Sequence, residues 1–240
     1  MSEWRATTMA VLDARDVVRT FRGGDGGIIH VLHGVHLTVA RGEMVAIVGA
    51  SGAGKSTLLH VCGALDRPNG GEVRVDGDSL SNRSDDELAS IRNRKIGFVF
   101  QFHHLLREFS ALENVMMPLR IAGSSDREAR SRAELLLGRV GLTGRMHHRP
   151  SELSGGEQQR TAVARALAMD PVLLLADEPS GNLDHGTAEM LHDLLAQLAR
   201  DLEIGMVVVT HNRSLAARAD RTLLLEDGRL AETDVRGVVT

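Results

Sequence analysis

The segment GASGAGKST, at residues 49–57, has the residue types and the spacing of a phosphate-binding loop. It follows the apolar run MVAIV and precedes a sequence that can form a helix. In such a loop the glycines let backbone N–H groups converge on phosphate oxygens, while Lys55 supplies a positive charge and Ser56 can ligate Mg²⁺. A tight glycine-rich turn is the weaker alternative in this context. We therefore predict that Lys55 contacts the β- and γ-phosphates of a nucleotide.

Two adjacent carboxylates, Asp177 and Glu178, end the apolar run VLLLADE. A carboxylate at the end of a buried strand can hold the hydration shell of Mg²⁺, and its neighbour can orient or deprotonate the attacking water. Taken alone, an Asp-Glu pair after a strand is more often a solvated turn. Because a phosphate-binding loop lies upstream, we interpret the pair as part of a phosphoryl-transfer site.

A second glycine-rich segment, LSGGEQQR at residues 153–160, leads into an expected helix. Ser154 and Glu157 have the spacing of a capping box, and a helix N-cap with no further role is the simpler interpretation. The functional interpretation is that Ser154, Gly155 and Gly156 form an anion site at the helix N-terminus. That site would need a phosphate other than the one at Lys55, so the chain would carry two incomplete half-sites.

For these segments to form one site, they must follow strands of one sheet whose carboxyl ends lie close together. Apolar runs at residues 44–48, 172–176 and 206–210 alternate with helical patterns, which indicates a mainly parallel sheet covered on both faces. Residues 11–21 and 29–40 predict an antiparallel sheet near the N-terminus, and Asp227-Gly228 predicts the turn of a hairpin. The expected fold class is therefore α/β.

The polar, arginine-rich sequence between residues 84 and 160 predicts an inserted helical subdomain, with capping boxes that begin at Ser84 and Ser125. Residues 1–83 and 161–240 would then form the core and the antiparallel sheet of one domain. After the insertion, residues 188–202 have one apolar face, which predicts a helix packed on the core. The residues of this face are Met190, Leu191, Leu194, Leu195 and Leu198.

The composition is that of an ordinary globular protein: 240 residues, 42% hydrophobic and 25% charged, with a formal net charge of −4. No basic tail indicates nucleic-acid binding. The single Cys62 lies among apolar residues, which predicts a buried structural thiol in a reducing compartment. We see no signal-peptide pattern and no run of about 18 apolar residues, so we expect any role at a membrane to be peripheral.

The stretch VFQFHHLLREF, at residues 99–109, combines two histidines with three of the five phenylalanines in the chain. Adjacent side chains on an extended segment diverge, so His103 and His104 are poorly placed to share a metal ion, and no Cys or carboxylate accompanies them at ligand spacing. We expect instead a partly exposed apolar surface that receives a short helix of a membrane partner.

The phosphate-binding loop, Gln101, LSGGEQQR, VLLLADEPSGNLD and VVVTH stand in the order of the motifs of ATP-binding cassette (ABC) transporter ATPases, which the chain resembles over nearly its whole length. The resemblance implies a P-loop ABC cassette that binds ATP and Mg²⁺. It also implies a homodimer in which cassettes pair head to tail, so that each ATP lies between the phosphate loop of one copy and LSGGE of the other.

The resemblance also assigns roles to single residues. Glu178 would act on the catalytic water, and His211 would reach the γ-phosphate. Phe21 falls where an aromatic residue, more often Tyr, stacks on adenine. The implied catalytic residues are Glu178, His211 and Gln101, and the implied metal-binding residues are Ser56, Gln101 and Asp177. The implied nucleotide-binding residues are Phe21, Gly49, Ser51, Gly52, Gly54, Lys55, Ser56, Thr57, Ser154, Gly155, Gly156 and Asp184.

Within the family, the sequence around Gln101 closely resembles the ATPase subunits of lipoprotein-releasing systems of Gram-negative bacteria, although Phe100 and Arg107-Glu108 depart from their pattern. This similarity implies two integral membrane subunits contacted through residues 101–109 and a lipoprotein cargo that the chain does not touch. It implies no nucleic acid, and a peripheral position on the cytoplasmic face of the inner membrane. Macrolide-exporter and cell-division ATPases are one alternative. A soluble ABC ATPase acting on nucleic acid or the ribosome is another, although such proteins usually carry two cassettes or a long coiled coil.

Overall fold

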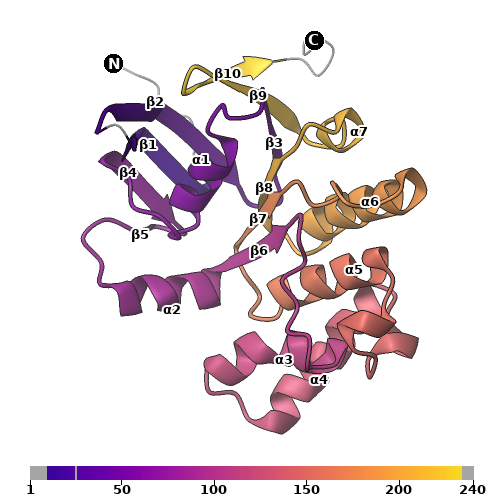
Figure 1. The fold of residues 1–240 in the computed structure, drawn as a ribbon. Coiled ribbons are helices and arrows are strands. Elements are labelled where there is room, and N and C mark those ends of the chain that lie inside the picture. The colour runs from indigo at the N-terminus through magenta and orange to yellow at the C-terminus, as the bar shows by residue number, and fades with distance from the viewer. Residues whose placement is uncertain (1–9, 25, 234–240) are drawn as a thin grey trace.

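The computed structural model describes residues 10–24 and 26–233, and its elements run through two sheets and a group of helices (Figure 1). The strands are β1 (Ala10–Arg22), β2 (Ile28–Ala40), β3 (Met44–Val48), β4 (Gly70–Val75), β5 (Asp78–Ser79), β6 (Ile96–Phe100), β7 (Leu173–Asp177), β8 (Gly205–Val209), β9 (Arg221–Glu226) and β10 (Arg229–Thr233). The helices are α1 (Lys55–Cys62), α2 (Asp85–Lys95), α3 (Ala111–Ile121), α4 (Asp126–Arg139), α5 (Gly155–Ala166), α6 (His185–Asp201) and α7 (Arg213–Ala216), with short 3-10 turns η1 (Thr143–Arg145) and η2 (Pro150–Glu152).

The two sheets confirm the expected α/β fold. The core sheet has the strand order β10-β9-β3-β8-β7-β6, in which only β10 runs antiparallel to its neighbour. The second sheet, β2-β1-β4-β5, is antiparallel throughout. The three expected core strands coincide with β3, β7 and β8 to within one residue. Fully apolar sequences form these strands because helices or the second sheet cover both of their faces.

Helix α1 lies between the two sheets (Figure 1) and joins their hydrophobic cores. Its residues Leu58, Leu59 and Val61 are buried among side chains of β1, β3 and β8. Cys62 is buried in the same cluster, as predicted, and burial raises the pKa of its thiol to about 12. The start of α1 is thereby fixed relative to β3, and this junction is the phosphate-binding loop.

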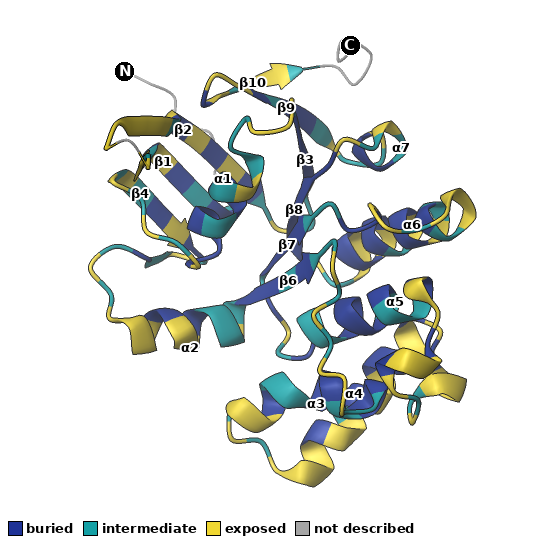
Figure 2. Cartoon of the chain, viewed as in Figure 1, coloured by how far each residue is buried: buried dark blue, intermediate teal, exposed yellow. Residues whose placement is uncertain are grey.

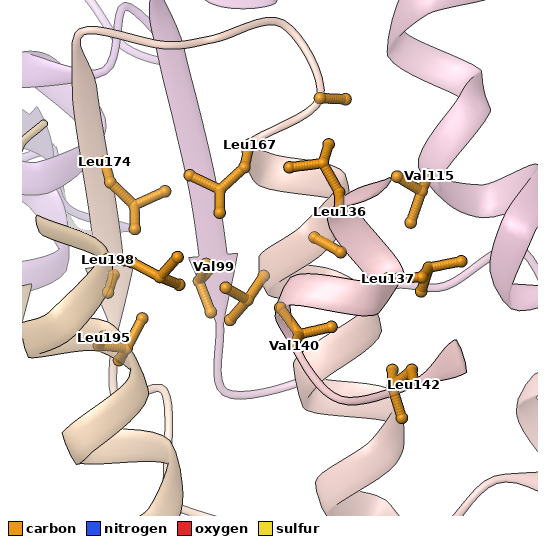
Figure 3. Close-up of a cluster of buried hydrophobic side chains, with 14 of the residues drawn as sticks. Val99, Val115, Leu136, Leu137, Val140, Leu142, Leu167, Leu174, Leu195 and Leu198 are labelled. Carbon is orange, nitrogen blue, oxygen red and sulfur yellow. The ribbon is translucent and has the colours of Figure 1, made fainter. Parts of the chain in front are cut away.

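Helices α3 and α4 form a separate group that packs on α5 (Figure 1). One cluster of buried side chains runs from β6, β7 and α6 into these helices, as Figure 3 shows with Val99, Leu174, Leu195, Val115 and Leu137. In Figure 2 the outer faces of α3 and α4 are largely exposed. The capping boxes predicted at Ser84 and Ser125 are present at the starts of α2 and α4.

Part of the predicted boundary of the helical subdomain is wrong. Residues 84–160 were assigned to it, but β6 pairs in parallel with β7 in the core sheet, and α2 packs Leu88 and Ile91 into the cluster shared by the two sheets. The helical group therefore begins after β6. A five-residue apolar run between polar segments has no periodicity that separates a buried strand from the end of a helix.

Helix α6 packs on the core with a face that differs from the predicted one. Leu191, Leu195 and Leu198 are buried as expected, whereas Met190 is 60% exposed. The inward position next to Leu191 is taken by His192. Among the described residues, no helix has the length and apolar character to cross a membrane.

Candidate active site

Four of the sequence motifs with candidate chemistry lie at the carboxyl ends of four neighbouring parallel strands. The phosphate-binding loop follows β3, His211 follows β8, Asp177 and Glu178 stand at the end of β7, and Gln101 follows β6. The carboxyl ends of parallel strands meet at one edge of a sheet, which is where open α/β sheets bind ligands. The core sheet therefore gathers segments that are more than a hundred residues apart in the sequence.

The phosphate-binding loop depends on glycine at positions that no other residue can take. Gly49 has a φ of 151°, and a Cβ there would lie 2.3 Å from the carbonyl oxygen of Leu225. Gly54 caps α1 with a φ of 99°, and a Cβ there would lie 2.8 Å from Val31. The loop therefore packs directly on β2 and β9, with its backbone free to approach a ligand.

Lys55 stands at the mouth of this loop. Its Nζ donates hydrogen bonds to the carbonyl oxygens of Gly49 at 2.8 Å and Ala50 at 2.9 Å, which hold the ammonium over the loop. The first turn of α1 contains no acidic residue, so the positive end of the helix dipole is not neutralised. Both features favour a bound anion at this point.

The phosphate-binding loop and the carboxylates face one cavity of about 370 Å³. The lining residues are Val31, Ser51, Gly52, Gly54, Lys55, Ser56, Thr57, Asp177, Glu178 and Val209. The sequence had not indicated Val31 or Val209, because single valines within strands carry no local signal of a site. A neighbouring hollow of about 680 Å³ shares Val31, Ser51 and Gly52 with it and extends along the turn between β9 and β10.

Ser56 and Asp177 are suited to Mg²⁺. Their hydroxyl and carboxylate oxygens line the same cavity, and Mg²⁺ prefers oxygen ligands, usually one or two protein groups together with phosphates and waters. Gln101, the third predicted ligand, does not line this cavity. Its Nε2 donates to Oδ1 of Asn182 at 3.0 Å, and Nδ2 of Asn182 donates back to the Gln101 carbonyl at 3.2 Å.

Glu178 is held by the loop that follows the neighbouring strand. Its Oε1 lies 2.8 Å from Nδ1 of His211 and accepts from the His211 backbone N–H at 3.0 Å, while Thr210 Oγ1 donates to Oε2 at 3.2 Å. The residue adopts a φ of 46°, a conformation that costs free energy and is often retained at active sites. The carboxylate is only 19% exposed, whereas the His211 ring is 76% exposed and can swing without disturbing the core.

The segment containing Ser154, Gly155 and Gly156 lies at the start of α5 and does not line the cavity at Lys55. The predicted capping box is present: Ser154 Oγ accepts from the backbone N–H of Glu157, whose carboxylate accepts in turn from the backbone N–H of Ser154. A Cβ at Gly156 would lie 2.3 Å from Thr187 of α6, so glycine is needed where the two helices meet. Ser154 and Gly155 are exposed and face outward.

Asp184 caps the N-terminus of α6. Its Oδ1 accepts from the backbone N–H of Thr187 at 3.1 Å, and hydrogen bonds from Thr187 lower the pKa of this carboxyl. Asp184 is exposed and, like Ser154, does not line the cavity at Lys55.

Phe21 lies at the end of β1, opposite Ile29 of β2, and is 39% exposed. The guanidinium of Arg19 lies 4.4 Å from the centre of its ring and covers one face. The predicted adenine contact would therefore use the other face of the ring. Phe21 does not line the cavity at Lys55.

Residues 101–109 connect the sheet to the helical group. Arg165 of α5 donates to the carbonyl oxygens of His103 at 2.8 Å and His104 at 2.7 Å, a contact that sequence patterns do not reveal. The His103 ring is half-buried, and its Nε2 has no hydrogen-bond partner among the described residues, while the His104 ring packs edge-on against Phe100. Phe102 is 65% exposed. The two histidines therefore have different surroundings, and Phe102 is the most exposed large apolar side chain of this segment.

Comparisons with known proteins agree with this geometry. The family model described as "ABC transporter" matches residues 32–181. The chain is similar to two proteins named lipoprotein-releasing system ATP-binding protein LolD. The one from Geobacter metallireducens is 54% identical over 92% of this chain and 98% of the relative. The one from Chromohalobacter salexigens is 50% identical over 95% of each. Among solved structures, the dimeric ATP-binding cassette MJ0796 bound to ADP and Pi matches with a TM-score of 0.85 and 42% identity, covering 94% of this chain and 99% of that chain.

Proposed function

The chain belongs to the ABC transporter family, and from that premise we propose that it is the ATP-hydrolysing subunit of a lipoprotein-releasing transporter, as its LolD relatives are named. The observation that carries the proposal is the cavity at the carboxyl ends of β3 and β7. It joins the phosphate-binding loop to the carboxylate pair, and His211 reaches the same carboxylate. Phosphoryl transfer needs such positioning and charge stabilisation more than it needs covalent chemistry.

In this proposal the loop binds the phosphates of ATP through its backbone N–H groups and Lys55. Glu178 accepts a proton from the attacking water, and His211 fixes the direction of that carboxylate through its Nδ1 and backbone contacts. Ser56 and Asp177 would hold Mg²⁺, which supplies positive charge for the phosphate oxygens. The His211 ring is largely exposed, so the rest of its edge is open to the γ-phosphate while Nδ1 contacts Glu178.

The two half-sites support a homodimer. Ser154 and Gly155 are exposed at the positive end of α5, and within one chain they do not face the cavity at Lys55. A second copy placed head to tail would bring this helix end to the γ-phosphate of an ATP bound by the first copy. The similar cassette MJ0796 forms a dimer in solved structures.

The membrane partner would contact residues 101–109 and the apolar hollow beside them. This hollow, of about 390 Å³, lies between α2, α3, α5 and β6. Its lining includes Leu65, Phe98, Phe100, Pro118 and Ile121, and two of these, Leu65 and Ile121, are exposed large apolar residues. A surface of this kind suits a short apolar helix of an integral membrane subunit. The protein would then work at the cytoplasmic face of the inner membrane without touching the lipoprotein.

The direct test of the chemistry is Glu178→Gln. Because the amide cannot accept the proton, we expect ATP hydrolysis to fall by roughly 100-fold or more, while Mg-ATP still drives dimer formation in size-exclusion chromatography. Glu134→Gln, on the exposed surface of α4, is the matched control and should hydrolyse ATP normally. Normal hydrolysis by Glu178→Gln, or no dimer with Mg-ATP, would contradict the proposed mechanism.

The test of the biological role is co-purification from detergent-solubilised inner membranes. We expect the protein to recover a stoichiometric pair of integral membrane proteins whose presence permits lipoprotein release from proteoliposomes on addition of ATP. Recovery of ribosomes or DNA would refute a transport role. Release of a different class of cargo would keep the ATPase assignment and refute lipoprotein release.

A further inference from the structure

His192 is the one buried histidine among the eleven in the sequence, all of which lie in the described part of the chain. It stands in the second turn of α6, with 0% of its surface exposed. An imidazole is polar on both sides, so full burial is costly unless its nitrogens meet suitable partners. One nitrogen meets the loop that follows the catalytic carboxylate, and the other faces a carboxylate of α6 itself.

On one side, His192 Nε2 lies 2.8 Å from the hydroxyl oxygen of Ser180. Ser180 is only 7% exposed and stands two residues after Glu178, in the loop that leads from β7 to Asp184 at the start of α6. The hydrogen bond therefore connects α6 to the loop immediately beyond the carboxylate.

On the other side, His192 Nδ1 lies 3.5 Å from Oε1 of Glu189, one turn earlier in α6, and neither atom has a hydrogen-bond partner among the described residues. Glu189 Oε2 accepts from Arg218 at 2.8 Å, and Arg218 also donates to the hydroxyl oxygen of Ser214 at 2.6 Å. Ser214 lies in α7, whose N-cap is the residue directly after His211.

The charges of this cluster determine which nitrogen of His192 carries the proton. Hydrogen bonds from Ser214 and Arg218 lower the pKa of Glu189, so this carboxyl is ionised. Burial lowers the pKa of His192, so its ring is neutral and carries one N–H. An ionised carboxylate beside Nδ1 favours the proton on that nitrogen, which leaves Nε2 to accept from the Ser180 hydroxyl. Asp193, which accepts from Arg218 at 2.8 Å, completes the charged groups around the ring.

We propose that His192 is a positioning residue for ATP hydrolysis: it ties the loop after Glu178 to α6, the helix that Glu189 and Arg218 connect to α7, so that the segments that follow Glu178 and His211 keep a fixed relation. The proposal rests on the function proposed above. The ring acts through its hydrogen bond with Ser180, and Glu189 of the same helix carries the connection on to Arg218 and α7. Loss of the link should misdirect Glu178 without emptying the phosphate-binding loop, because Lys55 and Ser56 are held by α1 and β3.

The test compares His192→Phe, which keeps an aromatic ring of similar size, with His192→Gln, whose amide can still bond the Ser180 hydroxyl. We expect His192→Phe to lower kcat for ATP about 10-fold and to change KM less than twofold, and His192→Gln to recover at least half of that loss on a logarithmic scale. His36→Phe, an exposed histidine of β2, is the control and should leave kcat unchanged. Thermal unfolding of each variant is measured in parallel.

A double-mutant cycle with Ser180→Ala decides whether the contact itself matters. If His192 acts through Ser180, the single changes should each lower kcat, and the double variant should be no slower than the slower single variant. Unchanged kcat in His192→Phe, multiplicative effects in the cycle, or equal losses in both His192 variants with lowered melting temperatures would overturn the proposal.

These outcomes all require a wild-type protein that hydrolyses ATP. A wild-type protein without ATPase activity would instead refute the proposed function, and the role of His192 would fall with it.

Discussion

The chain holds the phosphate-loop half-site and the half-site around Ser154 in different ways. The phosphate-loop half-site is assembled within one chain from the ends of neighbouring strands. Hydrogen bonds within the site hold its side chains: Lys55 donates to backbone carbonyl oxygens of its own loop, and Glu178 bonds His211. The other half-site is the first turn of one helix, with Ser154 and Gly155 exposed and outside the cavity that Lys55 and Glu178 line.

This difference separates binding from catalysis. A half-site that is complete within the chain can bind ATP in the monomer, whereas an exposed helix end can act only on a ligand presented by a second copy. Changes in the first half-site should therefore affect every step, and changes in the second should affect only the steps that need the dimer. The variants below test this separation.

The largest effect is expected for Lys55→Ala. Removal of the ammonium should weaken ATP binding by the monomer by about 100-fold, or roughly 2.7 kcal/mol, and should thereby prevent ATP-driven dimer formation as well. Calorimetric titration of the monomer measures the first effect and size-exclusion chromatography the second. Arg67→Ala, which removes an exposed cation paired with Asp85, should change neither. ATP binding within threefold of the wild-type value would show that the loop backbone alone suffices.

A comparison of Ser154→Ala with Ser125→Ala should distinguish a role of Ser154 in ATP hydrolysis from its role as a helix cap. Both serines accept from the N–H three residues on at 3.3 Å, so each change should lower the free energy of unfolding by about 1 kcal/mol. Only Ser154→Ala should also slow ATP hydrolysis, by about 10-fold, with monomer binding of ATP unchanged. Equal rates of ATP hydrolysis in the two variants would show that Ser154 acts only as a helix cap.

The two half-sites also differ in what the sequence could predict. The phosphate-binding loop and the carboxylates were identified because each motif is contiguous and follows a buried strand, and the capping box at Ser154 is equally local. The environment of Gln101 was not predictable, because its amide partner Asn182 lies 81 residues away. The inward position of His192 was missed because the predicted buried face was built from apolar residues alone, whereas the contact with Ser180 exists only once β7 and α6 are packed.

Phe102→Asp should leave both half-sites intact and weaken only the contact with the membrane subunits. Phe102 is largely exposed beside Gln101, so a charge there should weaken co-purification with the membrane subunits about fivefold, with ATPase activity of the isolated protein within twofold of wild type. Leu135→Asp, at an exposed apolar residue of α4, is the matched control and should retain the partners. A parallel loss of ATPase activity would assign Phe102 to the site rather than to the surface.

Phe21→Ala should give an effect no larger than that of Phe102→Asp, confined to the phosphate-loop half-site. Stacking of adenine on the ring face that Arg19 leaves free contributes about 1 kcal/mol, so we expect KM for ATP to rise about fivefold with kcat unchanged. At saturating ATP the dimer should form normally, because the phosphates and the Ser154 helix end are unaffected. Ile28→Ala, at an exposed apolar residue of β2 in the same hairpin, should leave KM unchanged. A fall in kcat in Phe21→Ala would mean that the hairpin reaches the second half-site, and the separation of binding from catalysis would no longer hold.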